Sequence, residues 1–430
     1  MKIKPYEKVN RDKFIPWRIT FFIFYVIGIF IAQAYLISSL YEPSKIYLKS
    51  INENKSYNKT TIDFFVFISN IANTIPYLIV LAFVYNFTNI YKSFVLLMVI
   101  LSSFLISGLL KLILAQPRPF FEDKDITNHD SGCSISFGNP SGNAVSATSF
   151  YLTLWHIIFE SSKLRNRTLI KYLSLSALVF IIFMILFGKF LTGTSSLDQI
   201  IFGLLIGLGM YCFIFFVLCV NVNDGIQFFA FMNIRNIIFL TANIIIFLIA
   251  LLMHIFIPVN PKQAEWLKII GMNANSKCPN EINSKNVFQQ EAFLMVSSFL
   301  TNFGAFLGLK MEYYFLFNAN TQNWNQYNFE KIENTEVNLL SKIGDHVFQW
   351  NHTSVVKSII RLILIFGLSV VFLLPFILIS SNQNIVIVFL FKYFLTLSLI
   401  SFSMFYLLKI IILKFRLDNQ TVFELMNDNL

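Results

Sequence analysis

Long apolar segments alternate with shorter polar segments along the whole chain. About ten of the apolar segments have roughly 20 residues, which is enough to cross a bilayer as a helix. They cover residues 19–40, 66–87, 93–115, 143–160, 172–190, 199–220, 237–258, 290–310, 357–380 and 384–408. The pattern therefore predicts an all-α, multi-pass membrane bundle of about ten spans.

Composition supports a membrane protein. Of the 430 residues, 56% are hydrophobic and 13% are charged, a balance that excludes a soluble globular domain of this size. The net charge of +10 is best explained by membrane topology rather than by nucleic-acid binding. Membrane lipids are thus expected partners, and nucleic acid is not.

Clusters of basic residues indicate how the spans are oriented. With ten spans, three basic segments fall on one side of the membrane, which the positive-inside rule makes cytosolic. They are the N-terminal arm, the loop 161–171 and the tail after residue 408. The polar segments 41–65, 116–142, 188–198 and 259–289 then face the opposite side.

Features of the N-terminal region and of the cysteines refine this picture. Segment 19–40 lacks a cleavage site and is expected to remain as an anchor. Glycosylation sequons at Asn54 and Asn58 favour the endoplasmic reticulum, while another organelle membrane, including the mitochondrial inner membrane, stays open. Cys133 and Cys278 share the predicted lumenal side, either as a pair or as two free thiols.

Three short stretches on the predicted lumenal side carry residues suited to phosphate chemistry. "KLILAQPRP" contains Lys111 at the end of a span and Arg118 in a Pro-Arg-Pro turn. "NPSGNA" places Ser141 and Gly142 before a helix, where backbone N–H groups favour an anion. "GKFLTGTSSLDQIIFG" contributes Lys189, Ser195, Asp198 and Gln199 at the junction of two spans.

Together these stretches resemble the three-part signature of the phosphatidic acid phosphatase and haloperoxidase superfamily. The first part, Lys-x6-Arg-Pro, is complete at Lys111, Arg118 and Pro119. The second, Pro-Ser-Gly-His, has Asn143 in place of histidine. The third, Ser-Arg-x5-His-x3-Asp, matches by position only, with Gly188-Lys189 for Ser-Arg, Ser195 for His and Gln199 for Asp.

Within that superfamily the chain most resembles the glucose-6-phosphatase catalytic subunits. The ending "DQIIFG" is similar to that family's His-Gln-x3-Gly, and "PKQAEWLKIIGMNANSKC" is similar to its Trp-containing loop. Nine spans with a lumenal site are typical of the family. The resemblance predicts a domain over residues 63–430, with a six-helix phosphatase-like core. Residues 1–62 would add a basic N-terminus, one further span and a lumenal loop.

The resemblance assigns a role to each position. In the family, the third-motif histidine attacks phosphorus, the second-motif histidine is the acid, and the cations neutralise phosphoryl oxygens. Lys111, Arg118, Ser141, Gly142 and Lys189 can still bind phosphate, although lysine cannot replace the bidentate grip of arginine. Asn143 and Ser195 stand at the two catalytic positions, where neither residue type supplies the missing imidazole. No cofactor or metal is expected.

Three functional interpretations remain open. The leading one is a catalytically inactive homologue that binds a phosphorylated small molecule or lipid, or that supports a membrane assembly. The second is an active phosphatase for glucose 6-phosphate or a lipid phosphate, with Asp198 or His129 as substitute catalytic groups. A transporter or channel is disfavoured, because no charged pairs or matched broken helices are found within the spans.

Overall fold

We describe the protein from a computed structural model. The described residues are 16–53, 58–87, 90–129, 136–160, 168–217, 262–272, 295–311 (except 297), 355–379 and 388–417 (except 416), with isolated residues between 241 and 252. This part of the chain contains helices and turns and no strand. The predicted all-α class is confirmed.

The first half of the chain builds most of the bundle. Its helices are α1 (Pro16–Glu53), α2 (Lys59–Asn70), α3 (Thr74–Phe87), α4 (Ile90–Leu114), α5 (Pro119–Glu122), α6 (Gly142–Glu160), α7 (Thr168–Leu191), α8 (Leu197–Cys212) and the π-helical η2 (Phe213–Val217). The second half contributes α11 (Gln263–Met272), η3 (Phe299–Thr301), α15 (Val355–Phe372), α16 (Leu374–Leu378), η4 (Val388–Leu395), α18 (Thr396–Phe402), η5 (Ser403–Leu407) and α19 (Leu408–Lys414).

The number of membrane spans is lower than predicted. Among the described residues, six helices are long and apolar enough to cross a membrane, or seven if the bent pair α2–α3 counts as one span. The predicted count of about ten is therefore not confirmed. Segment 237–258 lies largely outside the described residues. Helix α6 forms as predicted but is not among the six, because Asn143 and His156, together with its Ser and Thr residues, lower its hydropathy.

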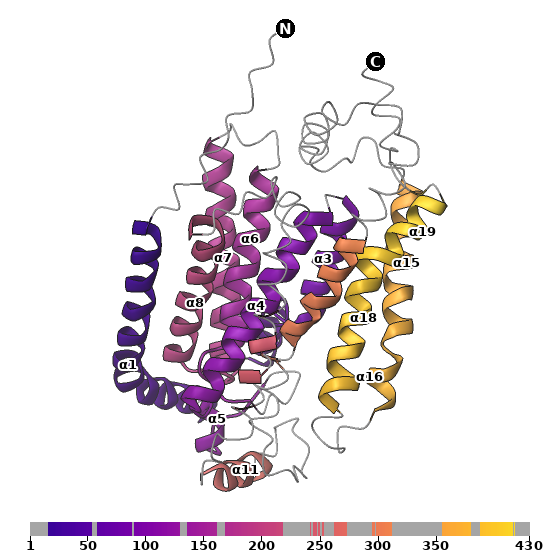
Figure 1. The fold of residues 1–430 in the computed structure, drawn as a ribbon. Coiled ribbons are helices and arrows are strands. Elements are labelled where there is room, and N and C mark those ends of the chain that lie inside the picture. Colours follow the sequence, from indigo (N-terminus) through magenta and orange to yellow (C-terminus); the bar gives the residue numbers. More distant parts are fainter. Residues whose placement is uncertain are drawn as a thin grey trace, which may run out of the picture.

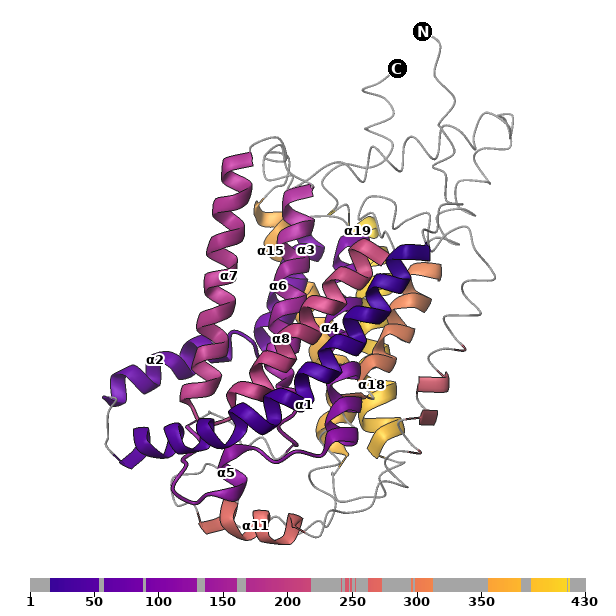
Figure 2. The ribbon, with the colours of Figure 1, turned by 90° about the vertical axis from the view of Figure 1, so that its left-hand side faces the viewer.

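Helices α1 and α2 correct the prediction for residues 41–65. This segment was expected to be a loop, yet α1 continues through Pro43 to Glu53, and α2 begins at Lys59. Figures 1 and 2 show the second part of α1 turning to run across the lower end of the bundle. Pro43 accounts for a bend there, because proline removes a helical N–H donor and its ring displaces the preceding turn.

The predicted span 66–87 is also divided. Helix α2 ends at Asn70, α3 starts at Thr74, and the two axes differ by 47°. Figure 2 shows α2 lying across the end of α7 rather than along it. The turn between α2 and α3 therefore sits at the same end of the bundle as the predicted lumenal segments. The predicted domain boundary at residues 62 and 63 falls inside α2.

Helix α6 occupies the centre of the bundle, between α4 and α8 (Figure 1). Two glycines of α8 allow the close approach: a Cβ on Gly203 would lie 2.7 Å from Ser141 O, and one on Gly207 would lie 2.8 Å from Thr148 Cβ. Small residues four positions apart are a common device for close helix packing in membranes. Part of the polar side of α6 is bonded within the bundle, as between Ser149 Oγ and Ser103 Oγ (2.6 Å), whereas the buried hydroxyls of Thr148 and Thr153 have no hydrogen-bond partner among the described residues.

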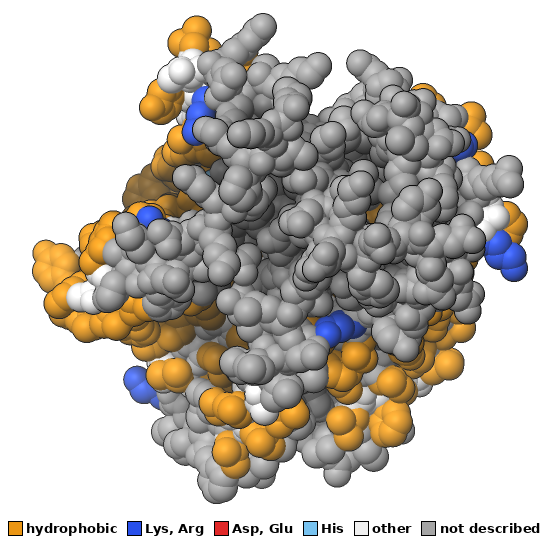
Figure 3. Space-filling model, turned by 45° about the horizontal axis from the view of Figure 1, so that its top comes forward, with side chains coloured by type: hydrophobic (Ala, Val, Ile, Leu, Met, Phe, Trp, Pro, Cys, Tyr) orange, Lys and Arg blue, Asp and Glu red, His pale blue; other side chains and the backbone are white. Residues whose placement is uncertain are grey.

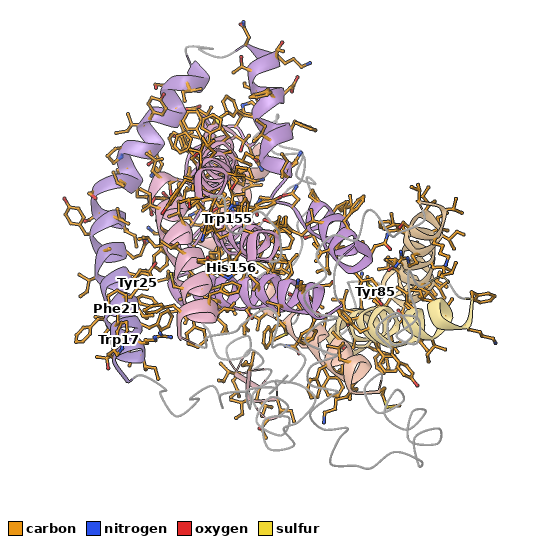
Figure 4. All side chains as sticks on the ribbon, turned by 90° about the horizontal axis from the view of Figure 1, so that it is seen from above. Trp17, Phe21, Tyr25, Tyr85, Trp155 and His156 are labelled. Atoms are coloured by element: carbon orange, nitrogen blue, oxygen red, sulfur yellow. The ribbon has the colours of Figure 1, made fainter. Side chains whose placement is uncertain are left out.

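Aromatic contacts fasten α1 to α8 and η2. Figure 4 shows Trp17, Phe21 and Tyr25 along α1. Tyr25 donates to Leu205 O (2.7 Å), and the Trp17 ring meets the Phe216 ring edge to face at 5.5 Å. Helix α1 is therefore packed against the bundle.

Figure 4 also marks His156 and Trp155 within α6. His156 Nδ1 lies 3.0 Å from Tyr211 Oη, and its ring stacks on Phe215 at 4.1 Å. His156 is thus a packing residue with a partner on α8, far along α6 from the predicted phosphate motifs. This explains one of the five histidines without a catalytic role.

The C-terminal helices α15 to α19 pack beside α3 and α4 (Figure 1). Tyr85 of α3, labelled in Figure 4, contacts Phe405 edge to face at 5.9 Å. Figure 3 views the upper end, where Lys and Arg side chains appear near a hydrophobic rim. No Asp or Glu of the described residues is visible on that face.

Candidate functional site

The predicted phosphate-binding residues meet at the lower end of the bundle. Lys111 lies in the last turn of α4 and is 1% exposed, while Arg118 caps the start of α5 and is 8% exposed. Lys189, in the last turn of α7, is 3% exposed. Burying cations is expensive unless their N–H groups are satisfied, so the partners of Lys111 and Arg118 define the site.

Lys111 and Arg118 share one partner, Ser136. Lys111 Nζ donates to Ser136 Oγ over 2.8 Å, and Arg118 NH2 donates to the same oxygen over 3.0 Å. Arg118 Nε donates to Ser136 O over 2.8 Å, and its NH1 donates to Thr194 O over 3.0 Å. We call Lys111, Arg118 and Ser136 the cationic clamp.

The second stretch joins the clamp at the start of α6. Ser141 is 4% exposed, and its backbone N–H donates to Gln199 O (3.0 Å). A Cβ on Gly142 would lie 3.7 Å from Lys111 Nζ, so the ammonium group reaches the N-terminal turn of α6. The glycine at this position lets backbone and cation approach closely, as expected for an anion site.

The third stretch closes the site from the turn between α7 and α8. Ser195 Oγ donates to Ser141 Oγ over 3.3 Å, and Thr194 Oγ1 donates to Lys189 O over 2.8 Å. Gly193 has φ of +74°, and a Cβ there would lie 2.6 Å from Thr127 O. Only glycine suits that position, so the turn geometry that presents Ser195 depends on it.

The three stretches thus form one site, in the order that the sequence signature requires. Residues 92–224 match the model of the PAP2 superfamily. The matched segment contains every predicted site residue, from Lys111 to Gln199. No curated protein and no solved structure matches the chain.

Asn143, the residue expected at the position of the signature's second-motif histidine, has a local partner. Its Nδ2 donates to Asn73 Oδ1 over 3.3 Å, and Asn73 belongs to the turn between α2 and α3. An amide can donate and accept hydrogen bonds but does not exchange a proton near neutral pH. Asn143 therefore links the site to that turn and cannot act as an acid.

Asp198 belongs to a buried network beside the site. It is fully buried, and its Oδ2 accepts from Gln116 Nε2 over 3.0 Å. Asn139 Nδ2 donates to Gln116 Oε1 over 2.5 Å, and Gln199 Nε2 donates to Pro117 O over 2.8 Å. These bonds hold the loops before α5 and α6 against the start of α8.

His129 lies near the turn that carries Ser195, in the segment predicted to be lumenal. Its Nε2 is 2.7 Å from Thr127 Oγ1, and its backbone N–H donates to Thr192 O over 3.0 Å. Burial lowers the pKa of this imidazole, while the nearby Asp63 carboxylate partly opposes the shift. The ring is therefore neutral over most of the physiological range and bonds to Thr127.

Other residues singled out in the sequence lie outside the described part of the chain. They include Cys133 and Cys278, so the predicted lumenal pair is not placed. Cys212 is a half-buried free thiol on α8. Within the described residues, no group of three or more His, Cys, Asp or Glu side chains is arranged to hold a metal ion.

Two important site residues were not foreseen from the sequence. Ser136 is one of several serines in "SGCSISFG", and nothing in that composition distinguishes it. Gln116 precedes the Pro-Arg-Pro turn and has no motif of its own. Both are recognised only because folding brings them against Lys111, Arg118 and Asp198.

Proposed function

We propose that this multi-pass membrane protein binds a phosphorylated lipid or small molecule in its PAP2-type site and does not hydrolyse it efficiently. One observation carries the proposal: Ser195 Oγ faces Ser141 Oγ at 3.3 Å, next to an assembled cationic clamp. The groups for anion binding are present, and those for proton transfer are replaced by a hydroxyl and an amide.

The binding half rests on charge and geometry. Lys111, Arg118 and Lys189 bring positive charge to a buried location, and the N-terminus of α6 adds a partial positive charge. Arginine offers a planar fork that matches two oxygens of one phosphate. A dianionic phosphate monoester is the ligand class that these groups favour most.

The proposal that hydrolysis is inefficient rests on the residue types at the two catalytic positions. A serine hydroxyl is a weak nucleophile unless a base removes its proton. Ser195 is bonded to another serine, and the acid position is Asn143, whose amide is bonded to Asn73. General acid–base catalysis contributes roughly 10²- to 10⁴-fold, so losing it together with the histidine nucleophile should leave little turnover.

The resemblance to the glucose-6-phosphatase catalytic subunits reduces the number of candidate ligands and candidate membranes. It makes sugar phosphates a ligand class to test beside phosphatidic acid, and it favours the endoplasmic reticulum. A structural role within a membrane assembly is compatible with the same fold. In every case the ligand would reach the site from the side opposite to the basic segments.

The test is phosphate release by the purified protein in detergent. Glucose 6-phosphate and phosphatidic acid are the substrates, and Arg118→Ala is the background control. We expect wild-type release to be within about a factor of ten of the control, because the proton-transfer groups are missing. Release that is abolished by Arg118→Ala and exceeds the control by 10³-fold or more would contradict the proposal.

One observation favours a second candidate, an active phosphatase with altered catalytic groups. Asp198 is fully buried, and its Oδ1 has no hydrogen-bond partner among the described residues. A carboxylate in such a position could act as a base or nucleophile. If Arg118-dependent release is found, Asp198→Asn and His129→Gln identify the group responsible. Unchanged release in both variants would remove this candidate.

A further inference from the structure

The fully buried Ser136 gives the cationic clamp an internal ligand. It presents two oxygens, Oγ and the backbone carbonyl, on the same side as Lys111 and Arg118. Arg118 bonds both oxygens through one edge of its guanidinium, with Nε on the carbonyl and NH2 on the hydroxyl. Lys111 bonds the hydroxyl as well. Two protein oxygens thus occupy the fork that would grip two oxygens of a phosphate.

The inference from this arrangement rests on the proposed function and extends it. We infer that Ser136 is an internal competitor that sets the affinity of the site for phosphate monoesters. A phosphate reaches the fork of Arg118 only after Ser136 has withdrawn its oxygens. The residue also stabilises the empty site, since Lys111 and Arg118 keep hydrogen bonds while no ligand is bound.

The energetics give the direction of the effect. A hydrogen bond to a charged group contributes more than a neutral one, and Ser136 accepts three bonds from the two cations. Binding of phosphate must replace these bonds, so only the difference appears as affinity. Removing the hydroxyl releases two of the three bonds in advance. The empty protein should then be less stable, and phosphate should bind more tightly.

The central experiment compares wild type with Ser136→Ala as full-length proteins in detergent. Equilibrium binding of radiolabelled inorganic phosphate gives Kd, and thermal unfolding at increasing phosphate concentration gives the linked stabilisation. We expect Ser136→Ala to bind phosphate at least about tenfold more tightly and to melt at a lower temperature without phosphate. Phosphate should restore much of that melting temperature.

Ser149→Ala is a matched control. Ser149 is also fully buried, but its hydroxyl bonds Ser103 between α4 and α6, away from the cations. It should lose stability without gaining phosphate affinity. If Ser136→Ala does not fold, Ser136→Gly also removes the hydroxyl and introduces no new acceptor, and the same gain in affinity is expected.

Two further arms identify the source of the phosphate group. Glucose 6-phosphate in solution and phosphatidic acid in mixed micelles compete with the radiolabelled phosphate on Ser136→Ala. Displacement by either one supports a clamp for phosphate monoesters and names the soluble or the lipid source. Displacement by neither would overturn the assignment of the ligand class.

The outcomes separate this inference from the proposed function. Equal phosphate affinity in wild type and Ser136→Ala, lost in Arg118→Ala, would overturn the role of Ser136 and leave the phosphate site standing. Absence of phosphate binding in all folded variants would overturn the phosphate site itself. A gain in both Ser136→Ala and Ser149→Ala would show a general loosening of the fold and would also overturn the role of Ser136.

Discussion

The two halves of the site differ in what their hydrogen bonds do. In the clamp half, Lys111 and Arg118 are buried and donate over 2.8–3.0 Å to Ser136, and Arg118 also bonds Thr194. In the half that contains the two proposed catalytic positions, Ser195 and Asn143 bond within the described residues to neutral neighbours over 3.3 Å. The first half concentrates charge, whereas the second contains no group that titrates near neutral pH at its two key positions.

Under the proposed function, this difference means that phosphate binding is kept while hydrolysis is lost. An anion site needs cations, N–H groups and a close backbone, and residues 92–224 retain all three. Phosphoryl transfer also needs a nucleophile and a proton donor with suitable pKa values. A protein that keeps the anion-binding groups is still stabilised by a bound anion, even when the nucleophile and the proton donor are replaced.

The largest effect is expected from removing the clamp arginine. Arg118→Ala leaves Ser136 O and Thr194 O without their donor in a buried location, where each unsatisfied group costs about 1–3 kcal/mol. We expect a loss of about 3 kcal/mol or more in the free energy of unfolding. The loss should appear as a lower melting temperature, together with loss of phosphate binding.

Arg118→Lys is the control for charge. It keeps a cation but cannot bond two oxygens at once, so binding and stability should fall between those of wild type and Arg118→Ala. An acidic residue at position 118 would test no property beyond the charge and the hydrogen-bond geometry that Arg118→Ala and Arg118→Lys already separate. If Arg118→Ala were as stable as wild type and still bound phosphate, the clamp half would not be what we describe.

A smaller effect is expected from forcing α8 away from α6. The Cβ of Gly203→Ala would lie 2.7 Å from Ser141 O and 2.8 Å from Ala144 Cβ, both in residues 139–144, which we call the phosphate loop. Overpacking of this kind costs about 1–3 kcal/mol and should weaken phosphate binding by moving Ser141. Thermal unfolding and phosphate binding measure the two consequences.

Gly367→Ala is the matched control for this variant. A Cβ on Gly367 of α15 meets nothing within 4 Å, so the substitution should be neutral or stabilise the helix by up to about 1 kcal/mol. Equal behaviour of the two variants would mean that the close contact between α6 and α8 does not position the phosphate loop.

A still smaller effect is expected where α1 supports the clamp from outside. Lys45 Nζ lies 2.9 Å from Glu122 Oε2 at the end of α5, the helix that Arg118 caps. Both side chains are partly exposed, so Lys45→Ala should cost at most about 1 kcal/mol and should be masked by high salt. Melting temperatures at low and high ionic strength test this. A large, salt-independent loss would assign α1 a stronger structural role.

The smallest effect concerns the pH dependence. Burial lowers the pKa of His129 below its usual value of about 6.5, so the unfolded chain binds the proton more readily than the folded protein. The contribution of His129 to stability is complete above that usual value and is lost as the pH falls through the lower folded pKa. We measure the melting temperature as a function of pH. His129→Gln should reduce the fall in melting temperature as the pH is lowered. An unchanged fall would assign the dependence to another group.

The sequence predicted the single helices well where apolar runs are bounded by polar residues. The predicted segments 93–115 and 172–190 correspond to α4 and α7 within a few residues. The break between α2 and α3 was missed, although Pro76 marks it: proline has no N–H to donate to residue 72 and its ring clashes with that carbonyl, so it favours the start of a new helix. The extension of α1 was missed because its polar second part and Pro43 are typical of a loop.

The site was predictable as a set of motif residues but not as a hydrogen-bond network. The spacing of Lys111 and Arg118 located the first stretch, and the structure brings all three stretches together. Ser136 and Gln116 have no signature in the sequence, because their roles depend on loop conformation. The hydrogen bonds of Lys111 and Arg118 to Ser136 could therefore be recognised only from the structure.

Under the proposed function, the site holds a phosphate monoester without cleaving it. The most direct measurement incubates the purified protein with ³²P-labelled phosphatidic acid or glucose 6-phosphate and follows both the bound ester and the released phosphate. We expect the label to stay with the intact ester, and we expect binding to require Arg118. Rapid conversion of bound ester to free phosphate, abolished by Arg118→Ala, would contradict the proposed function.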